Sequence, residues 1–231
     1  MKSFSILFLL VLSLSCSCQI NQDQMGLWKM YFVKADFKES QFGFQGDFQI
    51  RNWDLTTDLE QTIIRGGLTF KPKNESVLFT LGYGNILYGA FGYSRKRLNE
   101  NRIYQEVLYP VKFGKRIYTK HRFRFEQKCT EITGFRTRLR YKFFVSIPIN
   151  QAELNKGAIY FTVYNELFIN GMTHLKSGFE LEHFDRNRFY TSLGYILNDS
   201  FKIQIGIMNQ STNNWRKSQL QISCHHWIVD L

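Results

Sequence analysis

The sequence from Ile117 to Ile147 reads IYTKHRFRFEQKCTEITGFRTRLRYKFFVSI, and in two parts of it apolar and charged residues alternate. In both parts the odd positions are mostly apolar or aromatic, while the even positions are rich in arginine and lysine. Because successive side chains of a β-strand point to opposite faces, each part predicts a strand with one apolar and one charged face. The residues between them, Thr130 to Gly134, predict the turn of a hairpin.

The charged faces of this predicted hairpin share one side of the sheet. Their side chains need ion-pair or hydrogen-bond partners, because a charged group is not buried in an apolar core without one. Glutamates on later predicted strands can supply counter-charges. Two interpretations are open. We favour an internal salt-bridge network that fills a narrow barrel over an anion-selective lumen or a site in which arginines bind a phosphate or carboxylate. The candidate cluster contains Arg122, Arg124, Glu126, Arg136, Arg138, Arg140, Lys142, Glu166, Glu180 and Glu182.

Strand-like runs recur along the rest of the chain, roughly a dozen in all and about ten residues each, the length that a tilted strand needs to cross a bilayer. A strand in lipid must be paired on both edges, so the sheet has to close. The sequence therefore predicts an all-β fold, a single antiparallel transmembrane β-barrel of about 12 strands, with ten as the alternative. The alternative arises because Ser76 to Tyr93 is either two short strands or one bent strand. Examples of the runs are Phe42–Arg51, Val77–Tyr83, Ile159–Phe168, Phe179–His183, Phe189–Leu197 and Phe201–Gln210.

A soluble barrel or sandwich would show the same alternation with its faces reversed, since apolar residues would then point into a core. Three features favour the membrane version: aromatic residues gather at the ends of the runs, the runs are long, and the basic face is dense. Aromatic residues make up 16% of the chain, and Phe alone accounts for 22 residues.

The first 18 residues form a predicted signal peptide, with Lys2 ahead of a short apolar run and small residues at its end. Cleavage after Cys18 leaves residues 19–231 as one barrel domain. Lipidation of Cys16 or Cys18 is the alternative that we disfavour, because the residue three before each is serine rather than leucine. The chain is therefore expected in the outer membrane.

The net charge of +11 would suggest a nucleic-acid partner in a cytosolic protein. Because the predicted signal peptide directs the chain out of the cytosol, no nucleic-acid partner is expected. The expected partners are outer-membrane lipid and lipopolysaccharide, whose head groups are anionic. The oligomeric state is taken as monomeric by default. Cys129 and Cys224 remain after export, where a disulfide is allowed, although we favour two unpaired thiols. Neither a metal site nor a cofactor is expected.

The five histidines give no catalytic pattern. They lie outside any Gly-x-Ser-x-Gly or metal-ligand spacing, and adjacent histidines at 225 and 226 face opposite sides of a strand. Enzyme activity is therefore disfavoured. The histidines are His121, His174, His183, His225 and His226.

The stretches His121–Gln127 and Phe135–Lys142, together with Tyr164–Phe168 and Asp185–Tyr190, resemble a family of uncharacterised outer-membrane barrels. This is the domain-of-unknown-function family 2490 (DUF2490), found mainly in Bacteroidota. The resemblance covers nearly all of the mature chain and is most specific from Glu126 to Asn209. It implies an outer-membrane barrel without an established activity, so no catalytic residue is carried over. Arg188 falls in these stretches and joins the candidate cluster.

Three functions are compatible with these observations. We expect a structural or interaction barrel whose lumen is filled by its own charged side chains. A small anion-selective pore, or a binder of an anionic ligand, is the alternative, and a lipid-modifying enzyme is the third choice. The pattern also places Arg138 in the lumen and Leu139 against lipid, so Leu139→Arg is expected to impair folding more than Arg138→Leu.

Overall fold

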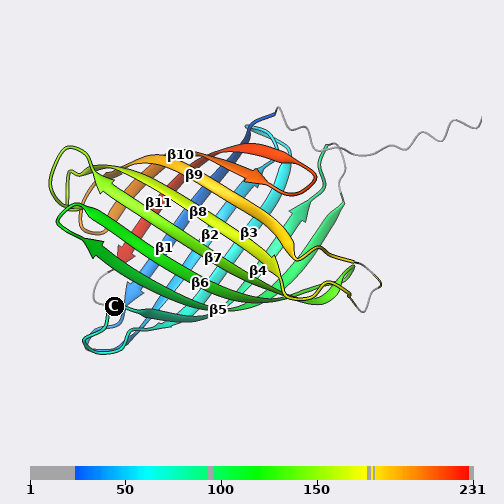
Figure 1. Cartoon of the computed structure of the whole chain (residues 1–231), viewed down its shortest axis with the longest axis horizontal. Helices are drawn as coiled ribbons and strands as arrows, with labels where there is room; N and C mark the ends of the chain where they lie inside the picture. Colours follow the sequence, from blue (N-terminus) through cyan, green and yellow to red (C-terminus); the bar gives the residue numbers. More distant parts are fainter. Residues whose placement is uncertain (1–23, 93–95, 176–177, 179, 229–231) are drawn as a thin grey trace, which may run out of the picture.

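The computed structural model describes residues 24–92, 96–175, 178 and 180–228, and all of its helix or strand content is β (Figure 1). Eleven strands are present in this part of the chain, a number between the two that the sequence predicts. The signal peptide predicted for residues 1–18 lies outside the described residues. The strands are β1 (Gly26–Asp36), β2 (Phe42–Asn52), β3 (Leu59–Phe70), β4 (Leu78–Gly89), β5 (Arg97–Phe113), β6 (Ile117–Thr130), β7 (Gly134–Pro148), β8 (Ile159–Asn170), β9 (Phe184–Ile196), β10 (Phe201–Ser211) and β11 (Arg216–Ile228).

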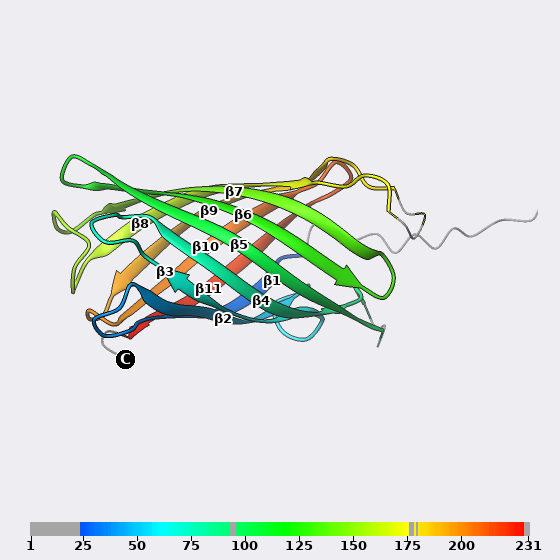
Figure 2. The same ribbon diagram turned by 90° about the horizontal axis from the view of Figure 1, so that it is seen from below.

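The strands form one closed barrel in which each strand pairs with its neighbours in sequence and β1 pairs with β11. Ten of the eleven pairings are antiparallel, but β1 and β11 run parallel, with Gly26 opposite Gln219 and Ala35 opposite Ile228. The parallel seam follows from the odd strand number. Figures 1 and 2 show inclined strands running between two rims, which we call the N-terminal rim, where β1 begins, and the C-terminal rim, where β11 ends.

The predicted hairpin is confirmed, with its turn where the sequence places it. Strand β6 ends at Thr130 and β7 begins at Gly134, and Glu126 lies opposite Arg138. The ambiguous segment 76–93 contains one continuous strand, β4.

The strand expected at Phe179–His183 is wrong for the residues described. They lie in the β8–β9 connection, where the described part holds only an isolated bridge between His174 and Glu180. The physical reason is local: the run is short, and Gly178 just before it has a φ of +82°, a conformation typical of a turn.

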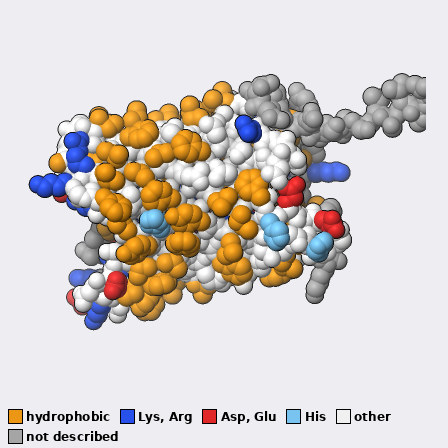
Figure 3. Space-filling view, in the orientation of Figure 1, with side chains coloured by type: hydrophobic (Ala, Val, Ile, Leu, Met, Phe, Trp, Pro, Cys, Tyr) orange, Lys and Arg blue, Asp and Glu red, His pale blue; other side chains and the backbone are white. Residues whose placement is uncertain are grey.

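The barrel wall is apolar on the outside and polar on the inside. Large hydrophobic side chains on its outer face are among the most exposed in the molecule, for example Ile64 and Leu81 at 60% each and Leu139 at 52%. The inward face instead buries charged and amide side chains, such as Glu126 at 0% and Arg138 at 7%. In Figure 3 hydrophobic side chains cover much of the wall in view, and charged ones lie mainly towards its two ends. In the described residues no helix is long and apolar enough to cross a membrane.

A group of amide side chains interrupts the apolar wall near the N-terminal rim. Asn165 and Asn187 exchange hydrogen bonds of 3.0 and 3.1 Å across the β8–β9 pair, and Asn85 donates to Asn99 at 2.8 Å. These residues have the same outward parity as the hydrophobic residues of their strands. We call this group the amide band, and it comprises Asn85, Asn99, Asn101, Gln127, Asn165, Asn187 and Asn209.

Two inward tyrosines lie over glycines on the neighbouring strand. A β-carbon built on Gly82 would come within 2.6 Å of the Tyr104 ring, and one on Gly194 within 2.7 Å of the Tyr160 ring. Both tyrosines are buried, at 2% and 3% exposed. The absence of a side chain at these glycines therefore lets the rings lie flat against the inner wall.

The two cysteines of the described chain do not form a disulfide. Cys129, on β6, is exposed and Cys224, on β11, is half-buried, and both are free thiols. This agrees with the interpretation favoured from the sequence.

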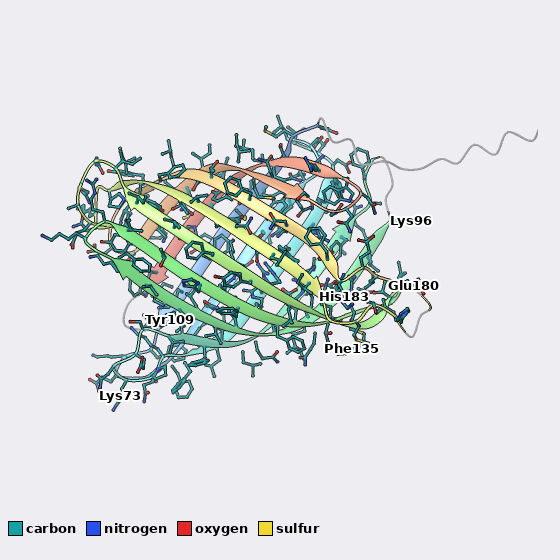
Figure 4. The ribbon with its side chains drawn as sticks, viewed as in Figure 1. Lys73, Lys96, Tyr109, Phe135, Glu180 and His183 are labelled. Atoms are coloured by element: carbon teal, nitrogen blue, oxygen red, sulfur yellow. The ribbon has the colours of Figure 1, made fainter. Side chains whose placement is uncertain are left out.

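The connections between strands form the two rims, with Lys73 and Tyr109 towards the C-terminal rim and Lys96, Glu180 and His183 at the N-terminal rim (Figure 4).

Candidate functional site in the lumen

Glu126 is the central carboxylate of the lumen. It lies on β6 with its side chain fully buried and accepts hydrogen bonds from three arginines on β5 and β7. Arg102 donates to it at 3.1 Å, Arg138 through two nitrogens at 2.7 and 2.9 Å, and Arg140 at 2.6 Å. These residues come together because inward positions on adjacent antiparallel strands lie side by side.

Each of the three arginines also binds a second carboxylate. Arg102 also binds Glu100 on its own strand, and Arg140 donates to Glu166 on β8 at 3.0 Å. Arg138 reaches Asp185 on β9 at 2.7 Å. A continuous set of ion pairs therefore crosses the inner wall from β5 to β9.

Each outlying carboxylate holds further cations. Glu166 accepts from Arg122 at 2.6 Å and lies 3.7 Å from the Lys142 amine. Glu100 binds Lys128 at 2.9 Å and Arg136 at 3.3 Å.

The opposite part of the inner wall is joined to this network by side chains that cross the lumen. Gln45 on β2 donates to Thr80 on β4 at 2.9 Å and to Glu106 on β5 at 3.1 Å. Arg65 on β3 pairs with Asp47 on β2 at 2.8 Å. Because β2 and β5 are separated by two strands, these bonds narrow the lumen rather than merely line it.

Two arginines in the lumen are held by neutral partners. Arg51 donates to Gln49 at 2.6 and 3.0 Å and to Gln61 at 2.9 Å, and its guanidinium lies 3.8 Å from the Trp28 ring centre. Arg188 donates to Gln210 at 2.6 Å and lies 4.9 Å from the same ring. Trp28 itself donates to a buried carboxylate, that of Glu60, at 2.9 Å.

The lumenal network, as we define it, contains twelve cations and seven acids. The cations are Arg51, Arg65, Arg102, Arg122, Arg124, Lys128, Arg136, Arg138, Arg140, Lys142, Arg186 and Arg188. The acids are Asp47, Glu60, Glu100, Glu106, Glu126, Glu166 and Asp185.

A cavity of about 90 Å³ lies inside the network. Its walls carry nine cationic side chains, together with Gln61, Ile63, Tyr88 and Phe168, and none of the described residues that line it is an acid. We call it the cationic cavity, and its cations are Arg51, Arg65, Arg102, Lys128, Arg136, Arg138, Arg140, Arg186 and Arg188.

A buried aromatic cluster lies in the lumen next to the network. Trp28, Tyr164, Tyr190 and Met208 form a buried cluster that joins β1, β8, β9 and β10. Phe168, only 1% exposed, lies 4.4 Å from the Arg140 guanidinium, so aromatic rings contact the charged layer directly. Packed aromatic side chains therefore occupy this part of the lumen.

The structure places nine of the eleven residues of the predicted cluster in the lumen. The other two, Glu180 and Glu182, lie in the β8–β9 connection instead, because β9 begins only at Phe184. Glu180 is 80% exposed and lies 3.4 Å from His174, and Glu182 accepts a hydrogen bond from Asn213 at the N-terminal rim.

Most of the acids that balance the network lie outside the cluster predicted from the sequence. On β5, Glu100, Arg102, and Glu106 face inward, but the outward neighbours near the rim are amides of the amide band rather than hydrophobic residues. The first part of β5 therefore shows no alternation between charged and apolar residues. The signal that could have found them is alternation between charged and neutral residues. The residues missed are Asp47, Arg51, Glu60, Arg65, Glu100, Arg102, Glu106, Lys128, Asp185 and Arg186.

One serine and one histidine meet in the lumen. The Ser223 hydroxyl lies 3.2 Å from Nε2 of His225, and the same nitrogen lies 3.0 Å from Gln204. The ring stacks on Phe32 at 4.8 Å. A hydrolytic triad requires the second ring nitrogen to be oriented by another group, and no hydrogen bond of that kind is present among the described residues.

Comparison with known proteins gives one match. The model of a family described as a protein of unknown function (DUF2490) matches residues 25–221. No curated protein matches the chain. No solved structure matches it either.

Proposed function

The chain belongs to the DUF2490 family of proteins of unknown function, and we propose that it is an outer-membrane β-barrel whose lumen is closed by its own side chains. The observation that carries this proposal is the distribution of polarity. Soluble monomers rarely expose a contiguous apolar patch larger than a few hundred Å². Here exposed leucine, isoleucine and phenylalanine side chains occur on strands all around the wall, while arginine and glutamate are buried inside. Lipid is the solvent that suits such a wall.

Closure of the sheet supports the same proposal. An open sheet edge has unpaired backbone groups, which lipid cannot satisfy, whereas in this barrel every strand is paired on both sides. The amide band gives the wall a boundary near the N-terminal rim, and exposed aromatic residues such as Tyr109, Tyr195 and Trp227 lie towards the C-terminal rim. Amphipathic aromatic rings are favoured at the membrane interface.

Membrane fractionation tests the compartment. We expect the mature protein in the outer-membrane fraction, resistant to extraction by high salt, and shifted in apparent size on gels when the sample is boiled, because a closed barrel stays folded in mild detergent. Recovery in the soluble periplasmic fraction would exclude the proposal that lipid covers the apolar wall.

Closure of the lumen rests on the two adjacent layers, the lumenal network and the aromatic cluster around Trp28. Reconstitution into a planar bilayer should therefore give no stable conductance steps. As a positive control, Trp28→Ala combined with Tyr190→Ala should produce steps, because it removes two buried rings from the aromatic cluster in the lumen. Tyr195→Ala, on the outer wall of β9, is the matched control and should stay silent. Anion-selective steps from the unmodified protein would instead support the small pore.

A further inference from the structure

We propose that the cationic cavity is a binding site for a phosphate-class oxyanion, either free phosphate or the phosphate group of a monoester. The inference goes beyond the proposed function, because a closed membrane barrel does not need a ligand. It is also independent of the membrane, since the cavity is formed by inward side chains alone.

The lumenal network has more cations than acids. Twelve cations face seven acids, so the layer carries five positive charges that no acid of the network balances. Removing ions from water is costly unless each is paired, and a buried ion without its partner strongly destabilises a fold. A bound phosphate monoester, with a charge of about −1.5 to −2 at pH 7, would balance part of this excess in one step.

Two of the cations in excess lie in the wall of the cationic cavity. Neither Arg51 nor Arg188 forms an ion pair with a described carboxylate; their donors reach only glutamine oxygens. Both are 7% exposed, and both line the cationic cavity. Arg136, a third lining residue, has a buried Nε without a hydrogen-bond partner in the described structure. The two arginines of the network that have no carboxylate partner among the described residues therefore both line the cavity.

The remaining walls of the cavity are already fixed in place. Arg102 and Arg138 are held by Glu126, and Lys128 by Glu100, so mutual repulsion does not push these cations apart. A ligand entering the cavity would meet preorganised donors and lose little affinity to ordering them.

Size and chemistry select the class of ligand. At about 90 Å³ the cavity is well below the roughly 300–1,000 Å³ of pockets that hold drug-sized ligands, so it suits one tetrahedral oxyanion rather than a nucleotide. Guanidinium groups match phosphate oxygens through paired hydrogen bonds, which a spherical halide cannot accept in the same way. Access is from the N-terminal rim, where the Arg136 and Arg186 side chains are 22% and 23% exposed. Phe135, next to Arg136, marks this rim in Figure 4.

Calorimetric titration of the full barrel in detergent tests the site, with inorganic phosphate and glycerol phosphate as probes and sodium chloride of equal ionic strength as the reference. We expect saturable binding of one phosphate per barrel and none of chloride. Saturation by both phosphates identifies the phosphate group as the ligand, and saturation by glycerol phosphate alone assigns the site to a head group or other monoester. Absence of saturable heat with both probes would overturn the proposal.

Two substitutions localise the binding. Arg51→Gln and Arg188→Gln each remove a cation from the cavity without leaving a paired carboxylate alone, so both variants should fold. Each should weaken phosphate binding at least about tenfold, the effect of losing roughly one charged hydrogen bond. Lys202→Gln is the matched control, because Lys202 faces the lumen on β10 but does not line the cavity. An equal loss in this control would refute the assignment to the cavity.

Thermal unfolding separates a binding role from a structural one. In chloride, Arg51→Gln and Arg188→Gln should unfold at the temperature of the unmodified barrel or above it, because they reduce the positive excess. Phosphate should raise the midpoint of the unmodified barrel, since a ligand of the folded state stabilises it, and this rise should disappear in both variants. If both variants unfolded well below the unmodified barrel in chloride and kept the phosphate-dependent rise, the two arginines would be structural and the proposal would fail.

Discussion

Glu126 shows how a single carboxylate organises several buried cations. Three arginines donate to it, and each of them also binds a second acid. Loss of its charge would leave Arg102, Arg138 and Arg140 without a shared partner inside a layer that is already positive. The sequence placed Glu126 on the charged face correctly, but its role as a shared acceptor depends on β5, whose inward residues the sequence analysis did not identify.

Glu126→Gln should therefore lower the free energy of unfolding by about 3–5 kcal/mol, the range found when one partner of a buried ion pair is removed. Urea titration of the barrel in lipid or detergent micelles measures this. Glu131→Gln is the control, because Glu131 is exposed in the β6–β7 turn and its substitution should change stability by at most about 0.5 kcal/mol. Equal effects of the two substitutions would show that the network does not stabilise the fold.

The contrast expected between Leu139→Arg and Arg138→Leu changes once the contacts are known. Arg138 faces inward and Leu139 outward, so the predicted faces are confirmed. Arg138 also pairs with Glu126 and Asp185, however, and leucine in its place would leave both acids short of a partner. A lumenal substitution at this position is therefore no longer expected to be mild.

Strands β6 and β7 show which elements a sequence specifies well. Their outward residues are mostly apolar or aromatic and their inward residues mostly charged, so the strands, their faces and their pairing as a hairpin could be predicted together. On β5 the amide band replaces apolar residues on part of the outer face, and the same pattern was missed. The expected strand at 179–183 failed because five residues of alternation do not outweigh a turn set by Gly178.

Outward positions on β7 provide a test of depth in the membrane. Leu139 lies well inside the strand and Phe135 next to its N-terminal-rim end, and the two are similarly exposed, at 52% and 55%. Arginine costs about 2–4 kcal/mol at the bilayer midplane and about 0–1 near the interface. Leu139→Arg should thus reduce refolding into lipid vesicles much more than Phe135→Arg does. Equal losses at the two positions would contradict the placement of the wall in lipid.

At the scale of the whole molecule, closure is the property that the sequence predicted and strand number the one that it left open. Alternation reports which face of a strand is apolar, and it contains no information on which two strands complete the ring. The pairing of β1 with β11 joins residues about 190 positions apart, for example Gly26 with Gln219, and no local pattern marks it. The parallel direction of this pair appeared only in the structure.

The parallel pairing of β1 with β11 places the two ends of the barrel's chain at opposite rims. With eleven strands, the chain enters the wall at one rim, at Gly26, and leaves it at the other, at Ile228. In a bilayer, whatever precedes β1 and whatever follows β11 occupy different aqueous compartments, so the two flanking segments cannot meet or share a partner. Joining them to relocate the chain break would require a linker as long as the barrel, threaded past the side chains of the lumenal network.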